Sequence, residues 1–335
     1  MQYEWIGNVA YIMNDYTTIK FYNIFNEKIE PNTLPENLTT LTFGKKFNKK
    51  IGPNTLPENL TTLTFGDNFN RIIKSNSLPE KLTSLTFGDN FNQKINPNTL
   101  PEKLTTLIFG RYFNQKIKPN TLPENLTNLT FGDGFKQKIE PNTLPKNLTF
   151  LTFGWFFNQK IEPNTLPVNL KTLTFGYHFN KKIKPDTLPV NLKTLTFGYY
   201  FSQKIKPNTL PENLTNLTFG ENFTQKIDSE MLPANLKNIN FDWLHLDYYE
   251  PIEHHIEMVN NISSYYHVEL FLKRDIFIIN RLKWPIHVVD YEEYNWSSKI
   301  YEIQNEYTHK KYGSITILIN KESFQPYSFA KSALK

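Results

Sequence analysis

Hydrophobic and polar positions recur with a strict period along most of this chain. The phenylalanine that begins each copy returns every 22 residues without an insertion, and ten copies follow one another. They begin at Phe25, Phe47, Phe69, Phe91, Phe113, Phe135, Phe157, Phe179, Phe201 and Phe223. A period held this strictly predicts a solenoid, in which each copy is one turn whose core only the neighbouring turns can bury.

Each copy contains one short segment with the pattern of a β-strand. In the second copy Leu63 and Phe65 alternate with Thr62 and Thr64, which is typical of a half-buried strand whose β-branched residues face water. The wider spacing L-x-x-L-x-[LF] is that of a leucine-rich-repeat strand, and a 22-residue copy falls within the range of such repeats. Gly66 follows, and we expect it to let the backbone leave the strand in a conformation that other residues tolerate poorly.

The rest of each copy predicts an irregular return path. Phe69, Ile73 and Leu78 are expected to turn inward and fill the core. The Pro-Asn pair at 53–54 and the Leu-Pro pair at 56–57 exclude a regular helix, because proline lacks an N–H and restricts the residue before it. We therefore predict a mainly β protein: a leucine-rich-repeat-like parallel β-solenoid of ten 22-residue repeats, with a small α+β C-terminal cap.

The period divides the chain into three parts. Residues 1–24 are interpreted as an N-terminal half-repeat cap, since their last residues align with a strand one period later. Residues 25–244 are the ten repeats. Residues 245–335 lose the period, and we interpret them as an α+β cap on the last turn; the alternative is a separate functional domain. Within this tail we expect a helix over residues 252–266 and strands over 268–273, 276–279, 286–291, 299–303 and 314–319.

The repeated series FNQKI…PNTLPENLTTLTFG resembles the FNIP repeat, a leucine-rich-repeat-like family of amoebae and of their large DNA viruses. The resemblance covers residues 25–244 and implies a repeat protein that binds other molecules and has no catalytic residues. The chain departs from the standard leucine-rich pattern, which places an asparagine three residues after the strand. Here the frequent asparagine falls two residues later, at Asn48, Asn70, Asn92 and Asn114.

Composition and charge limit the compartments and the partners that we expect for the protein. Cysteine is absent, which excludes disulfides and cysteine-based metal sites and suits a reducing compartment. The first residues lack the pattern of a secretion signal, and the longest apolar runs are too short to span a bilayer. The formal net charge of +5 is mild for this length and requires neither nucleic acid nor a membrane as partner. We expect a monomer in the cytoplasm, or in the host-cell cytoplasm if the source is a virus, without membrane attachment.

Catalytic and metal-binding motifs are missing from the sequence. Six histidines lie in the tail, and the adjacent pair His254-His255 is the best candidate for a metal site. Adjacent residues on a helix point about 100° apart, so we interpret this pair as solvent-facing. The sequence contains no G-x-S-x-G, P-loop or G-x-G-x-x-G pattern. We predict no enzyme, no metal and no cofactor; an enzyme housed in the tail is the weakest alternative.

One repeat position carries a row of lysines: Lys28, Lys50, Lys94, Lys116, Lys138, Lys160, Lys182, Lys204 and Lys226. Stacked turns would place this lysine row on one flank, where it could bind a polyanion such as RNA or DNA. Lysine is also a common solubilising residue on such a surface, and neighbouring glutamates offset part of the charge. We therefore treat polyanion or nucleic-acid binding as the alternative function.

Three consecutive repeats depart from the pattern in residue type. The position after the strand glycine, acidic in several other copies, becomes Trp155, Tyr177 and Tyr199, with Phe156, His178 and Tyr200 beside them. Outward strand positions that are mostly threonine become Phe150, Lys171 and Lys193. Aromatic residues with a few cations are typical of interface hot spots. We predict a protein–protein interaction scaffold whose concave face binds an unidentified protein on one rim through Phe150, Trp155, Lys171, Tyr177, Lys193 and Tyr199; ordinary aromatic surface is the alternative.

Overall fold

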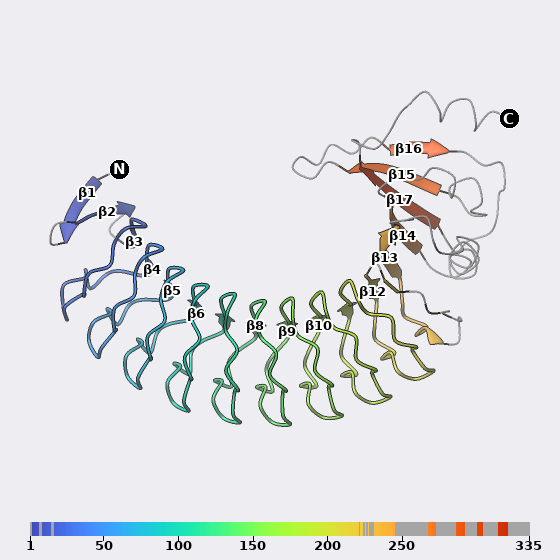
Figure 1. The fold of residues 1–335 in the computed structure, drawn as a ribbon, viewed down its shortest axis with the longest axis horizontal. Helices are drawn as coiled ribbons and strands as arrows, with labels where there is room; N and C mark the ends of the chain where they lie inside the picture. Colours follow the sequence, from blue (N-terminus) through green and yellow to red (C-terminus); the bar gives the residue numbers. More distant parts are fainter. Residues whose placement is uncertain are drawn as a thin grey trace. The chain divides into compact units, whose positions relative to one another are not determined.

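A computed structural model describes residues 2–6, 9–14, 17–220, 222–223, 225, 227, 231–244, 267–272, 286–291, 300–303 and 314–320. The chain divides into two compact units, Met1–Phe179 and Asn180–Lys335. Each unit contains short β-strands joined by turns and extended segments, and the described residues contain no α-helix (Figure 1).

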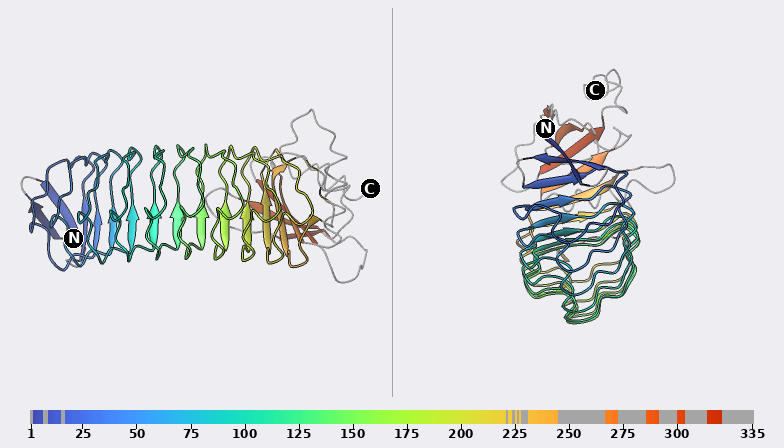
Figure 2. Two further views of the ribbon diagram at one scale, coloured as in Figure 1. Left: turned by 90° about the horizontal axis from the view of Figure 1, so that it is seen from below. Right: turned by 90° about the vertical axis from the view of Figure 1, so that its left-hand side faces the viewer.

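The first unit is a parallel stack that begins with an antiparallel edge. Strand β1 pairs antiparallel with β2, and β2 pairs antiparallel with β3. From β3 onward each strand pairs in parallel with the next at a register of one repeat, as in Ile19 opposite Leu41. Figure 2 shows these strands at the same level of every turn. The strands are β1 (Gln2–Ile6), β2 (Val9–Asn14), β3 (Thr18–Phe21), β4 (Thr40–Thr42), β5 (Thr62–Thr64), β6 (Ser84–Thr86), β7 (Thr106–Ile108), β8 (Asn128–Thr130), β9 (Phe150–Thr152) and β10 (Thr172–Thr174).

The second unit begins with parallel strands one repeat apart and then changes its pairing. Strands β11 to β14 pair in parallel in chain order. Strand β14 next pairs with β17, which pairs in parallel with β15, and β15 pairs antiparallel with β16. The strands are β11 (Thr194–Thr196), β12 (Asn216–Phe219), β13 (Asn238–Leu244), β14 (His267–Leu272), β15 (Ile286–Tyr291), β16 (Ile300–Ile303) and β17 (Ser314–Asn320).

These strands confirm the predicted fold class. Four of the tail strands expected from the sequence are present, as β14, β15, β16 and β17. The expected strand over residues 276–279 and the expected helix over 252–266 lie outside the described residues. Where it is described, the return path consists of turns and extended segments, as its prolines indicated.

Two columns of phenylalanines run through the core of the stacked turns, together with buried leucines and isoleucines. Within one turn Phe87 stacks on Phe91, with ring centroids 3.8 Å apart. Across turns Phe87 stacks on Phe109 at 5.7 Å, and Phe91 on Phe113 at 6.1 Å. These rings are at most 2% exposed, as is Leu85 beside them. The large aromatic area buried in each turn, together with its stacking, stabilises the interface between neighbouring turns.

An asparagine in the left-handed conformation reverses the return path. Asn54 has a φ of 59°, and the residues at this position in neighbouring turns have nearly the same value. Pro53 precedes it, and the N–H of Thr55 donates to the carbonyl oxygen of Gly52 at 3.4 Å. Proline followed by a residue with positive φ is the combination that a type II turn requires. Asparagine is one of the few residues with a side chain that tolerates this conformation.

The reason for the strand-ending glycine differs from the prediction. Gly66 does not adopt the left-handed backbone conformation. A Cβ at this position would instead lie 1.9 Å from the carbonyl oxygen of Gly44 in the preceding turn. The expectation of an unusual backbone conformation was therefore wrong, because the constraint is the close approach of two stacked backbones.

Candidate interaction surface

Two stacked aromatic pairs lie on consecutive turns of the first unit, just after strands β9 and β10. Trp155 stacks on Tyr177 with ring centroids 4.1 Å apart and planes at 12°. Phe156 stacks on His178 at 5.2 Å, also at 12°. Trp155 and Phe156 are 45% and 44% exposed, and Tyr177 and His178 are half-buried. We call these four residues the aromatic cluster.

The backbone of the turn positions the aromatic cluster. The N–H of Phe156 donates to the carbonyl oxygen of Asp133 at 2.9 Å, and the N–H of His178 donates to that of Trp155 at 2.9 Å. An equivalent bond forms where the repeat carries a small polar residue, as at Asn90. The bond is thus a property of the repeat, and the aromatic side chains are additions to a turn that folds without them.

Two cationic side chains, from the two turns that precede the aromatic cluster, lie close to aromatic rings. The Nζ of Lys136 lies 4.9 Å from the centroid of the Phe156 ring. The guanidinium carbon of Arg111 lies 5.7 Å from the Tyr112 ring, and Arg111 also pairs with Asp133 at 3.6 Å. Sequence analysis did not single out Lys136 or Arg111. The sequence could have pointed to Lys136, because this lysine replaces the asparagine found at the same position in most other copies.

Phe150 and Lys171 lie at the starts of strands β9 and β10, whereas the aromatic cluster follows the ends of these two strands. Phe150 is the first residue of β9 and is 47% exposed, and Lys171 is exposed just before β10. Trp155 follows β9, five residues after Phe150, which in an extended chain is on the order of 15 Å. The strand separates these two groups along the chain, and the expectation that all predicted interface residues share one rim stays a prediction.

The remaining predicted interface residues belong to the second unit. Lys193 is exposed just before β11, and its carbonyl oxygen accepts the hydroxyl of Thr215 at 3.0 Å. The Tyr199 ring meets the Tyr200 ring edge to face, with centroids 4.9 Å apart. An aromatic pair thus also follows the strand in this unit.

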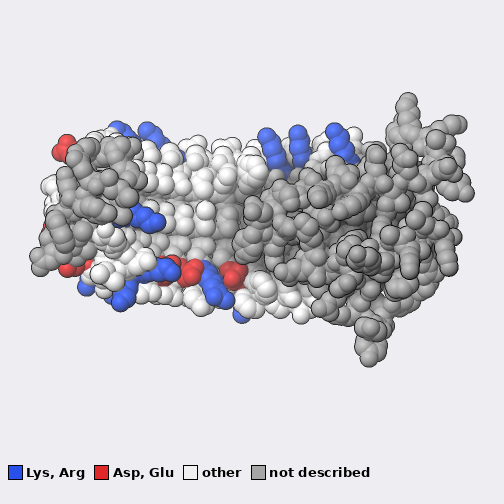
Figure 3. Space-filling model, turned by 90° about the horizontal axis from the view of Figure 1, so that it is seen from above, with Lys and Arg blue, Asp and Glu red and all other residues white. Residues whose placement is uncertain are grey.

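Within the first unit, four of the six lysines of the lysine row pair with glutamates, and two of those four share one glutamate. Lys28 pairs with Glu30 at 2.9 Å, and Lys160 pairs with Glu162 at 2.6 Å. Glu140 pairs with both Lys138 and Lys116, at 3.2 and 3.6 Å. On the face shown in Figure 3, charged residues of this unit follow the margins, and the middle is mainly uncharged. The row is a mixed-charge flank here, not a continuous basic stripe.

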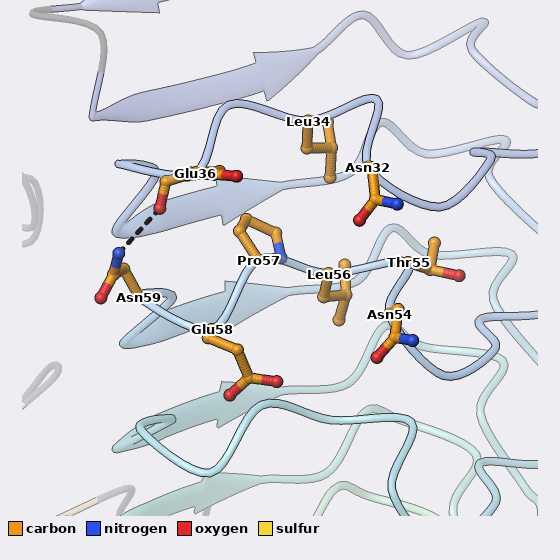
Figure 4. Close-up of a pocket in the computed structure, with 9 residues that line it drawn as sticks. All are labelled: Asn32, Leu34, Glu36, Asn54, Thr55, Leu56, Pro57, Glu58 and Asn59. Atoms are coloured by element: carbon orange, nitrogen blue, oxygen red, sulfur yellow. Dashed lines mark hydrogen bonds between the residues drawn. The ribbon is translucent and has the colours of Figure 1, made fainter.

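A hollow of about 260 Å³ opens between the first two turns on the return side (Figure 4). It is lined by Asn32, Leu34, Glu36 and residues 54–59. The side-chain amide of Asn59 donates to the carbonyl oxygen of Glu36 at 2.9 Å across it. These residues belong to the segment PNTLPEN, whose first five residues recur in seven of the ten copies, so the hollow follows from stacking of the repeat and not from a dedicated site.

No metal site or membrane-crossing helix emerges from the part of the chain that is described. That part has no group of three potential metal ligands. It also lacks a helix with the length and apolarity that a bilayer crossing requires. The side chains of the tail histidines, including the predicted solvent-facing pair His254-His255, lie outside the described residues.

Comparisons with known proteins agree with the repeat geometry. The chain is similar to the crystal structure of CroV588, a giant-virus protein described as a novel circular LRR protein, with 46% sequence identity and a TM-score of 0.68. The similarity covers 77% of this chain and 38% of that chain, so the present chain spans less than half the length of that protein. Among curated proteins none matches the chain.

The model of the FNIP Repeat family matches successive pairs of turns. The matched segments are residues 25–68, 47–88, 69–112, 113–156, 157–200 and 201–242. Together they form a continuous run over more than half of the chain. The turn geometry, the phenylalanine columns and this match agree, and the chain belongs to the FNIP repeat family.

Proposed function

We propose that this protein is a non-enzymatic scaffold that binds another protein through the aromatic cluster. Solenoids of leucine-rich-repeat type commonly act by binding. The observation that carries the proposal is the exposure of Trp155 and Phe156 in two stacked pairs, where other turns carry Asp67 and Asn68 or Asp89 and Asn90. Exposed aromatic groups that do not fill the core are typical of binding surfaces.

The stacking of the aromatic cluster favours binding. Trp155 is already held against Tyr177, and Phe156 against His178, so few rotamers remain to be lost when a partner covers them. Tryptophan and tyrosine are also the residues most enriched at interface hot spots. The cluster thus combines a large apolar area with a low ordering cost.

The test compares captured proteins between matched variants. The double variant Trp155→Asp, Tyr177→Asp restores the acidic residue that Asp67 and Asp89 supply at the same repeat position. We expect it to fold and to lose a partner that the wild type captures from an amoebal lysate. Removing two central aromatic residues should weaken the affinity for the purified partner at least about tenfold.

Phe150→Thr is the matched control at the other end of the strand. It restores the threonine found in most other copies and leaves the aromatic cluster untouched. If the partner survives Trp155→Asp, Tyr177→Asp but is lost with Phe150→Thr, the binding surface is the strand start and the proposal is wrong. Identical capture by all three proteins would make the cluster ordinary surface.

Polyanion binding is the second candidate, and a basic group in the second unit favours it. Lys182 and Lys184 flank the buried Ile183, and Lys204 and Lys206 repeat the arrangement one turn later. All four lysines are exposed, and their positions match those that hold lysine–glutamate pairs in the first unit. Four ammonium groups on neighbouring turns repel one another, and a phosphate backbone would relieve that repulsion.

Retention on immobilised single-stranded RNA tests this candidate. Replacing the four lysines by glutamine should lower the salt dependence of binding by up to about three units in the log–log slope. The control replaces Lys28 and Lys160, which are paired with glutamates, and should change the slope little. Equal elution of both variants and the wild type would remove polyanion binding from consideration.

A further inference from the structure

A single position two residues after the strand glycine changes character along the first unit. It is Lys46 in the first copy, Asn68 and Asn90 in the next two, then Tyr112, Gly134, Phe156 and His178. The N–H of each of these residues donates to a carbonyl oxygen of the preceding turn, at 2.8 Å for Tyr112 and 2.9 Å for Phe156. Because the bonds repeat at every turn, these positions form one column, which we call the post-glycine column.

Gly134 interrupts the aromatic part of this column. On one side of it stands Tyr112, 53% exposed, and on the other side Phe156, 44% exposed. Beyond Phe156 the column continues with His178, whose ring stacks on Phe156 at 5.2 Å. The turn of Gly134 is therefore the one place between Tyr112 and His178 where the column has no side chain.

The interruption spans one turn of the stack. Backbones two turns apart in a parallel stack are separated by about 10 Å. A planar ring inserted between two others needs about 7–8 Å between them, since carbon atoms in contact lie 3.5–4.0 Å apart. The spacing of two turns between Tyr112 and Phe156 thus matches the thickness of one inserted ring and not of two.

A cation lies over each of the two rings that border the gap. Lys136, from the same turn as Gly134, holds its Nζ 4.9 Å from the centroid of the Phe156 ring. The guanidinium of Arg111 lies by the Tyr112 ring and is paired with Asp133 at 3.6 Å, whereas Lys136 forms no ion pair among the described residues. A carboxylate beside an inserted ring would meet Lys136, whose ammonium would move from the ring face to the acid.

We propose that the gap at Gly134 is a slot for one aromatic side chain of a partner protein, next to an acidic residue of that partner. The inserted ring would stack between Tyr112 and Phe156 and complete the aromatic column down to His178. The acidic residue would pair with Lys136. This inference rests on the proposed role in protein binding and adds to it the chemistry of the partner's segment.

The probe is the peptide acetyl-Glu-(4-fluoro-Phe)-Glu-amide, followed by fluorine NMR during titration with the full chain. We expect broadening and a shift of the single fluorine signal on binding. Tyr112→Asn and Phe156→Asn should each weaken binding at least about fivefold, because each removes one wall of the slot. Both variants restore the asparagine of Asn68 and Asn90, so they should fold. Gly134 is left unchanged, because a Cβ there would meet the carbonyl oxygen of Arg111 at 2.8 Å.

Two controls separate this slot from the rest of the surface. Tyr177→Asp, outside the slot, should leave the affinity for the peptide within about twofold, although it should impair capture of the natural partner. Replacing both glutamates of the peptide by lysine should weaken binding to the wild type several-fold and remove the effect of Lys136→Gln. No binding of the peptide, or binding that survives both Tyr112→Asn and Phe156→Asn, would overturn the slot. If capture of the natural partner still depended on Trp155 and Tyr177, the proposed function would stand even though the slot at Gly134 was rejected.

Discussion

At the scale of single residues, the polar side chains of the repeat bind the backbone of the neighbouring turn. The hydroxyl of Thr83 donates to the carbonyl oxygen of Thr61 at 3.1 Å. The Oδ1 of Asn70 accepts the N–H of Asn92 at 3.0 Å. Sequence analysis located these residues but interpreted the threonines as facing water, because a period gives the spacing of polar residues and not their hydrogen-bond partners.

Another threonine of the repeat has a different environment, which gives a prediction. Thr121 is 3% exposed, and its hydroxyl has no hydrogen-bond partner among the described residues. Thr121→Val keeps the shape and removes the unpaired hydroxyl, so it should raise the free energy of unfolding by about 1 kcal/mol. Urea denaturation of both proteins measures the difference.

Thr83→Val is the matched control for this prediction. It removes a hydroxyl that is bonded across turns, and it should lower the free energy of unfolding by about 1 kcal/mol. If Thr121→Val destabilised the protein as much as Thr83→Val, the buried hydroxyl would have to be hydrogen-bonded in solution, for example to a buried water molecule.

At the scale of the element, the strands could be predicted from sequence, but one of their constraints could not. Alternation of Leu63 and Phe65 with threonines located the strand, because side chains of a strand alternate between its two faces. The glycine after the strand was recognised, but its cause was not. Close approach of two stacked backbones depends on the neighbouring turn, and no local pattern within one copy carries that information.

Substituting a strand-ending glycine tests this constraint. A Cβ at Gly88 would lie 1.9 Å from the carbonyl oxygen of Gly66 and 2.4 Å from its carbon, so the two backbones would have to separate. Gly88→Ala should therefore lower the free energy of unfolding by more than about 3 kcal/mol. Thermal and urea unfolding monitored by circular dichroism would show this loss.

Gly52→Ala is the corresponding control in the return path. Its Cβ would meet only the Oγ1 of Thr55, at 3.7 Å, which is ordinary contact. The substitution should change stability by less than about 1 kcal/mol and could raise it by restricting the unfolded chain. Comparable losses for Gly88→Ala and Gly52→Ala would show that crowding between turns is not what selects the glycine.

At the scale of the whole molecule, the sequence predicts the pairing of strands wherever neighbouring repeats are alike. Identical turns meet identical neighbours, so one copy predicts the pairing of all of them. In the second unit β17 lies between β14 and β15, although it comes last in the chain. Four tail strands were predicted from alternation, but their order was not, because strand order depends on long-range packing that leaves no local signal. The aromatic cluster was found as a departure from the period, while the two ends of its strands could be told apart only in the structure.

The repeat architecture makes a prediction about how stability is distributed in the first unit. Leu107 is fully buried and opposes Leu85 and Leu129 in the adjacent strands. Leu107→Ala should cost about 3 kcal/mol, most of it felt by the turns in direct contact, since solenoid turns interact with their neighbours alone. Native-state hydrogen exchange should then show lost protection in β6, β7 and β8, with β3 and β4 less affected. Leu41→Ala, equally buried, should shift the loss to β3, β4 and β5. An equal loss of protection along every strand for both variants would instead indicate that the unit unfolds as one cooperative body, and that nearest-neighbour coupling is too strong for local opening.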